Sequence, residues 1–203
     1  MEKIATAISH SNHWQSRLFL SAGSLMAFNT AMLWLRHLSD YKISIIWAAI
    51  PAILAFSCAV FGLFKLYNQA SLGAPFIAKV GAGAALLSLG SLGCAAGWIF
   101  FLFSFGQGMP TPPPQGFLLL IGLFMIAMVV AFSCMALSFF SQEGQKKIAW
   151  LLSLPVAMWL LMIVVSLQQG MAVGLSLDFY TNAVIAAAFM GLGASFKSRV
   201  VQG

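Results

Sequence analysis

Six apolar runs, each long enough to cross a lipid bilayer, dominate this sequence. The hydrocarbon core of a bilayer is about 30 Å thick, so a helix needs about 20 apolar residues to span it. Charged residues make up only 7% of the chain, whereas soluble domains carry roughly 25%. We therefore predict an all-α polytopic membrane helix bundle with six transmembrane helices and one transmembrane domain over residues 18–196. The predicted spans are roughly Leu18–Leu35, Ile43–Phe64, Val80–Ser104, Phe117–Phe140, Ile148–Leu167 and Leu175–Phe196.

The breaks between these runs differ in strength. The clearest is GQGMPTPPPQG at Gly106–Gly116, whose prolines lack the backbone donors that a continuing helix requires. The boundary between the fifth and sixth runs depends mainly on Gln168, Gln169 and Gly170. A five-helix bundle, with that region re-entrant, is the alternative.

Basic residues indicate how the bundle sits in its membrane, because cytoplasmic loops carry an excess of Lys and Arg. With six helices, Arg36 and Lys42 are the only basic residues on the side opposite the termini. We therefore expect a protein of the cell inner membrane or plasma membrane, with both termini in the cytoplasm. Residues 1–17 would form an interfacial segment and residues 197–203 a tail. The basic residues on the cytoplasmic side are Lys3, Arg17, Lys65, Lys79, Lys146, Lys147, Lys197 and Arg199.

The net charge of +6 suits attraction to anionic lipid head groups on the cytoplasmic side. Topology explains this charge, so no nucleic-acid partner is needed. We predict membrane lipids as partners, with other membrane subunits as further candidates.

Two patterns compete as signs of an internal repeat. AFSC occurs at Ala55–Cys58 and Ala131–Cys134, and the related AAAFMG stands at Ala186–Gly191. All three lie in predicted helices of one direction, as three helical hairpins would require, although biased composition also produces such matches. The rival pattern pairs Pro51 with Pro155, each about two turns into its helix. Interrupted helices in matching halves point to transporter sites, but a plain proline kink is the commoner feature.

Few residues within the predicted helices could carry chemistry. Acidic residues, lysine, arginine and histidine are missing from mid-membrane depth, which argues against proton-coupled or cation-coupled transport and against haem. Cys58, Cys94 and Cys134 do not form a metal-ligand spacing, and His10 with His13 would supply at most half of a metal site. We therefore predict no catalytic residue, no cofactor and no metal.

The outer ends of the first and last predicted helices hold the most suggestive cluster of side chains. Arg36 could pair with Asp178 if these helices are neighbours, because an acidic side chain slightly inside the boundary favours a cationic partner. Such a mixture of groups could meet a lipid or quinone head group, or fix the helices at the interface. The candidate residues are Arg36, His37, Asp40, Tyr41, Asp178 and Tyr180.

The third predicted helix is rich in small residues, including Gly93 and Gly97 at small-xxx-small spacing. Small residues let membrane helices pack closely, and the partner could lie within the chain or on another subunit. Together these observations favour a non-catalytic accessory or scaffold subunit of a larger membrane assembly. One alternative is a small permease or channel for an uncharged or lipidic solute, using Pro51 and Pro155. Another is a lipid-handling or quinone-handling protein with a site at the outer face.

Overall fold

The computed structural model describes residues 2–40, 42–44, 46–106, 110, 113–169 and 177–202. Within this part the chain forms helices and no strands. Six helices are long and apolar enough to cross a membrane, which confirms the predicted all-α bundle and favours six spans over five. They are α1 (Glu2–Leu38), α2 (Ile46–Ala70), α3 (Pro75–Ser104), α4 (Gln115–Phe140), α5 (Lys146–Gln169) and α7 (Asp178–Gln202). Gly170 and the start of the sixth predicted span lie outside the described residues.

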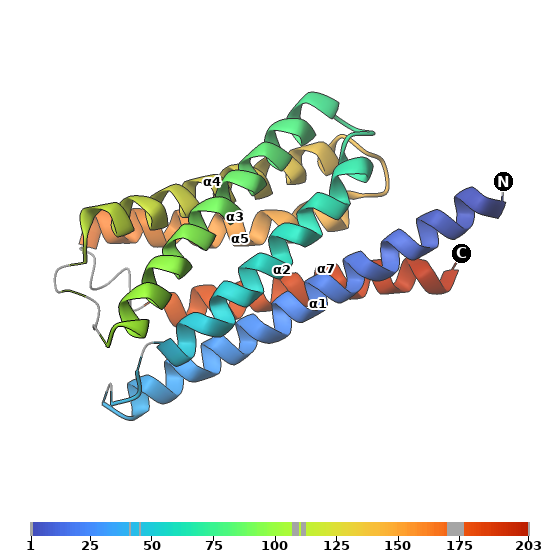
Figure 1. Ribbon diagram of the computed structural model, residues 1–203. Helices are drawn as coiled ribbons and strands as arrows, with labels where there is room; N and C mark the ends of the chain where they lie inside the picture. The colour runs from blue at the N-terminus through green and yellow to red at the C-terminus, as the bar shows by residue number, and fades with distance from the viewer. Residues whose placement is uncertain are drawn as a thin grey trace.

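The helices form a closed ring of neighbours (Figure 1). Each described helix packs beside the next one in the chain, and α7 returns to pack beside α1. Both termini lie at one end of the bundle, which we call the terminal end. The opposite end, where α1 finishes and α2 and α7 begin, is called the far end. Helix α1 is continuous from Glu2, so the expected interfacial segment extends the first span as one helix.

A chain of aromatic rings crosses the core. Phe56 of α2 and Phe132 of α4 both contact Trp159 of α5, with ring centroids 6.0 and 5.8 Å apart. Phe132 also stacks on Phe189 of α7 at 5.8 Å, and Phe189 lies 6.2 Å from Phe19 of α1. Each aromatic pair adds about 0.5–1.5 kcal/mol beyond its buried area. These rings therefore join five of the helices.

Three of these rings, Phe56, Phe132 and Phe189, belong to the three Ala-Phe motifs. Aligned on them, α2, α4 and α7 bury the same positions. The preceding alanine and the residues three, four, six and seven places later are buried in all three helices. The residues two places before and five places after the motif phenylalanine are exposed in all three helices. This agreement supports the scheme of three equivalent helices. The motif sequences alone could not do so, because a chain of biased composition also produces such matches by chance.

At the terminal end, glutamine side chains connect three elements. Gln15 of α1 donates from Nε2 to the carbonyl oxygen of Lys65 at 2.8 Å, and Gln69 of α2 donates to Oε1 of Gln15 at 3.3 Å. Gln142, after α4, donates to the carbonyl oxygen of Gln69 at 3.0 Å. Buried polar groups in a membrane protein need partners of this kind because lipid supplies none. The bonds therefore fix how α1, α2 and α4 meet at this end.

Candidate functional site

Buried polar side chains of α1 and α7 gather toward the far end. Asn29 and Thr30 of α1 are 4% and 8% exposed, and Thr181 and Asn182 of α7 are 2% and 8% exposed. Amide and hydroxyl groups are costly to bury in apolar surroundings unless they are hydrogen-bonded. Such a cluster therefore needs internal partners or a ligand.

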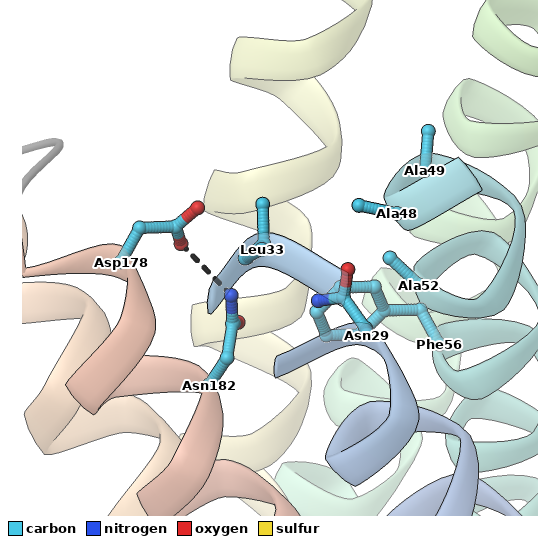
Figure 2. A pocket seen from close by; sticks show the side chains of 8 residues that line it. All are labelled: Asn29, Leu33, Ala48, Ala49, Ala52, Phe56, Asp178 and Asn182. Carbon is cyan, nitrogen blue, oxygen red and sulfur yellow. Dashed lines mark hydrogen bonds between the residues drawn. The ribbon is translucent and has the colours of Figure 1, made fainter. Parts of the chain in front are cut away.

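An open-sided hollow of about 210 Å³ lies beside these residues, between α1, α2 and α7 (Figure 2). A water molecule needs only about 10–15 Å³ of cavity space, so the hollow has room for a small molecule or a lipid head group. We call it the far-end pocket. It is lined by Asn29, Leu33, Ala48, Ala49, Ala52, Phe56, Asp178 and Asn182.

Asp178 and Asn182 form the α7 wall of this pocket. Nδ2 of Asn182 donates a hydrogen bond to Oδ1 of Asp178 at 3.0 Å (Figure 2). Their four-residue spacing places both side chains on one face of the helix. Asp178 is the first residue of α7, where an acidic side chain interacts favourably with the helix dipole. The bond occupies one carboxylate oxygen and leaves the other on the pocket side.

Asn29 of α1 directs its amide toward the same hollow (Figure 2). Its Nδ2 donates to the sulfur of Met26 at 3.6 Å, and a thioether is a weak acceptor. Among the described residues, Oδ1 of Asn29 has no hydrogen-bond partner. The pocket therefore contains a side chain that is more than nine-tenths buried and whose carbonyl oxygen is available to a ligand.

The α2 wall owes its space to small side chains around a proline. Ala48, Ala49 and Ala52 line the pocket and flank Pro51, which is buried within α2. Proline cannot donate the helical hydrogen bond to the carbonyl four residues earlier, that of Trp47. Three methyl-sized side chains in this turn leave the hollow unfilled.

Two of the predicted outer-face residues, Arg36 and Asp178, do not form a pair in the structure. Helices α1 and α7 are neighbours, as we expected. Arg36, however, donates from Nε to the carbonyl oxygen of Ile43 at 3.1 Å. Asp178 makes no ion pair within the described part of the chain and bonds Asn182 instead. The structure thus groups Asp178 with two buried amides rather than with a cation.

Three other predicted outer-face residues, His37, Asp40 and Tyr180, do not line the pocket. His37 and Asp40 are exposed where α1 ends, and Asp40 has a φ of 51°. Tyr180 is exposed and contacts the ring of Phe179 edge-on at 5.3 Å. Tyr41 lies outside the described residues.

The pocket is suited to binding by hydrogen bonds and charge. Asp178 is the one ionisable side chain among its eight lining residues. No group of three histidine, cysteine or acidic side chains that could hold a metal occurs among the described residues. Cys58 and Cys134 are half-buried in their helices, and Cys94 is exposed on α3.

The outward side of α3 is a second candidate feature, which we call the glycine face. A Cβ atom added to any of its four glycines would have open space around it to 4 Å. Exposed Cys94 lies among them. The within-chain packing considered for Gly93 and Gly97 therefore has no counterpart among the described residues. The glycine face consists of Gly83, Gly90, Gly93 and Gly97.

Sequence reasoning missed Asn29, Thr181 and Asn182. One available signal was a pair of polar dipeptides, Asn-Thr beginning at Asn29 and Thr-Asn ending at Asn182. Their reversed order brings like residues together when the two helices pack antiparallel. The Ala-Phe alignment offers another. In this alignment Asn182 corresponds to Ala49 of α2 and Met125 of α4. The other two helices therefore have an apolar residue where α7 has an amide at the pocket.

The six long apolar helices are those of a multi-pass helical membrane protein. Compared with known protein families, curated proteins and solved structures, the chain matches none of them. The far-end pocket and the glycine face therefore carry the functional argument.

Proposed function

We propose that this chain is a non-catalytic accessory or scaffold subunit of a larger membrane assembly. In this role it would pack a transmembrane helix of a partner against the glycine face. The observation that carries the proposal is the open space over all four glycines of that face. Membrane helices associate largely through close packing, because lipid chains are as apolar as side chains, and glycines permit the closest approach.

Glycines at helix contacts within this chain behave differently from those of the glycine face. A Cβ atom on Gly23 would lie 2.7 Å from Cγ of Met190, and one on Gly81 would lie 3.0 Å from Cβ of Cys134. The chain therefore uses glycine for close helix packing where a neighbour is present. The glycine face has the same composition without a described neighbour, which supports a partner from another molecule.

The spacing of the glycine face also favours a helix partner. Gly83, Gly90 and Gly97 are seven residues apart, and a seven-residue repeat keeps positions on one stripe of a left-handed helix pair. At a rise of 1.5 Å per residue, this stripe is about 21 Å long. It covers a large share of the roughly 30 Å apolar layer.

Site-specific photo-crosslinking in native membranes tests this proposal. We expect a photoreactive amino acid at Gly90 or Gly97 to give a discrete protein adduct, whose mass separates a second copy of this chain from another subunit. The matched control is the same substitution at Leu119 of α4, which is 74% exposed and should react with lipid. If both α3 positions give lipid adducts alone in a stably inserted protein, the proposal is wrong.

We also propose that the terminal end faces the cytoplasm of an inner or plasma membrane. Lys65, Lys79, Lys146 and Lys147 are exposed at that end, which supports this orientation by the positive-inside rule. The same lysines would attract anionic lipid head groups.

A second candidate function is binding of a small solute or lipid head group at the far-end pocket. The buried and available amide of Asn29 is the observation that favours it. This function combines two alternatives predicted from the sequence, a lipid-handling site at the outer face and part of the permease hypothesis. Pro51 stands between pocket-lining residues, whereas Pro155 is buried in α5 and does not line the pocket. The proline pair as a transport element therefore gains less support than the pocket itself.

A further inference from the structure

We propose that the far-end pocket binds a primary ammonium group, carried either by a lipid head group or by a small free amine. The inference rests on the second candidate function above and adds the chemical class of the ligand. A primary ammonium group has one positive charge, three N–H donors and no acceptor. A site for it must therefore supply negative charge and several oxygen acceptors.

The pocket supplies these acceptors from two helices. The carboxylate of Asp178 accepts one bond from Asn182 and has a second oxygen on the pocket side. Oδ1 of Asn182 accepts no hydrogen bond from the described residues and is therefore available to a ligand. Oδ1 of Asn29 is unpartnered among the described residues. The pocket thus offers as many acceptor oxygens as the ammonium group has N–H donors.

Charge also selects the ligand. An anion would meet the carboxylate of Asp178, whose charge is not neutralised by an ion pair with any described residue. A quaternary ammonium group carries positive charge but has no N–H to donate to Asn29 or Asn182. Hydrogen bonds to charged groups are stronger than those between neutral groups, so a primary ammonium group uses this set of atoms best.

The remaining walls suit the carbon atoms next to such a group. Leu33, Phe56 and three alanines give the pocket an apolar lining opposite the acidic residue. Asp178 is the first residue of α7, and Asn182 lies one helical turn further along it, which is about 6 Å of helix rise. The acceptors therefore lie near the end of a spanning helix, where lipid head groups meet their acyl chains.

Lipid retention in nanodiscs tests the inference. The full-length protein is placed in nanodiscs with equal amounts of phosphatidylethanolamine and phosphatidylcholine of the same acyl chains. Lipids that stay bound after release are then counted by native mass spectrometry. We expect about tenfold preference for the ethanolamine lipid, and loss of this preference in Asp178→Asn, as removal of one charged hydrogen-bond partner implies.

Two further variants keep the test informative. Asp40→Asn removes an exposed carboxylate from the same end of the bundle, and asparagine tolerates the φ of 51° at this position. It should retain the wild-type preference. Asn29→Leu removes an acceptor from α1 and fills part of the pocket. Because the lost amide is buried without a strong partner, this variant should fold well and still lose the preference.

A soluble arm separates the two sources of ammonium. In nanodiscs of phosphatidylcholine alone, ethanolamine is added and the shift in unfolding temperature is measured. A shift that Asp178→Asn abolishes supports binding of a free amine, and selective lipid retention without such a shift supports a lipid head group. Equal retention of both lipids that depends on Asp178 overturns the ammonium inference but leaves binding at the pocket intact. If neither Asp178→Asn nor Asn29→Leu changes lipid retention and ethanolamine gives no shift, the ammonium inference and ligand binding at the pocket are both wrong.

Discussion

Ser16 of α1 donates a hydrogen bond from its Oγ to the carbonyl oxygen of Gly193 of α7, at 2.8 Å. This bond connects the first and last helices and closes the ring. It forms because the two backbones lie unusually near one another. A Cβ atom on Gly193 would be 2.6 Å from Cγ of Leu20 and 2.8 Å from its amide nitrogen.

Gly193→Ala should therefore destabilise the bundle. The added methyl group meets backbone as well as side-chain atoms of α1, and overpacking of this kind costs about 1–3 kcal/mol. Gly97→Ala is the matched control, because its methyl group enters open space and alanine favours helix by up to about 1 kcal/mol. Thermal unfolding in detergent should show a lower midpoint for Gly193→Ala and an equal or higher one for Gly97→Ala. Similar losses in both would contradict the close contact.

Thr181→Val should raise stability, which is uncommon for a core substitution. Oγ1 of Thr181 is buried and has no hydrogen-bond partner in the described structure, and such a group costs about 1–3 kcal/mol. Valine keeps the shape and removes the hydroxyl. Thr30→Val is the control, because Oγ1 of Thr30 donates to the carbonyl oxygen of Met26 at 2.9 Å. Unfolding midpoints should rise for Thr181→Val and stay level or fall for Thr30→Val; a fall in the first would mean that its hydroxyl has a partner.

Apolar length was sufficient to predict the six spans, because in lipid each backbone polar group must be satisfied within a helix. The helix ends were harder to predict. Helix α3 begins at Pro75 rather than near Val80, since a helix can continue past its apolar run. Lys79 lies in that extension, and a long lysine side chain can keep its charge at the head-group level.

The far-end pocket could not be predicted in the same way. Asn29 and Asn182 are neutral, so they stand out less than charged residues in an apolar run, and only the ring closure brings them together. The expected Arg36–Asp178 pair failed for a local reason. The carbonyl oxygen of Ile43 lies within reach of Arg36, and a nearby backbone acceptor competes with a carboxylate on another helix.

The equivalence of the two AFSC motifs has its own test. Cys58 is half-buried against the core, and Cβ of Cys134 faces Gly81 of α3. Leucine at either site should overpack a helix contact and lower stability by about 1–3 kcal/mol. Val130→Leu is the control, because Val130 is exposed next to the second motif. Comparable losses at both cysteines in thermal unfolding would support equivalence, whereas a loss at one and none at the other would leave the shared letters a matter of composition.

The orientation of the bundle predicts which turns can be labelled from outside an intact cell. Pro113 and Glu143 are exposed just beyond opposite ends of α4, a helix whose 26 residues rise about 39 Å. A single spanning helix must therefore place them on opposite sides of the membrane. In a background with the three native cysteines changed to alanine, Pro113→Cys should react with a membrane-impermeant maleimide in intact cells. Glu143→Cys should react only after the membrane is permeabilised, because Lys146 and Lys147 follow it and favour the cytoplasmic side. Labelling of Glu143→Cys in intact cells, with Pro113→Cys protected, would reverse the orientation. It would also move the far-end pocket to the cytoplasmic leaflet.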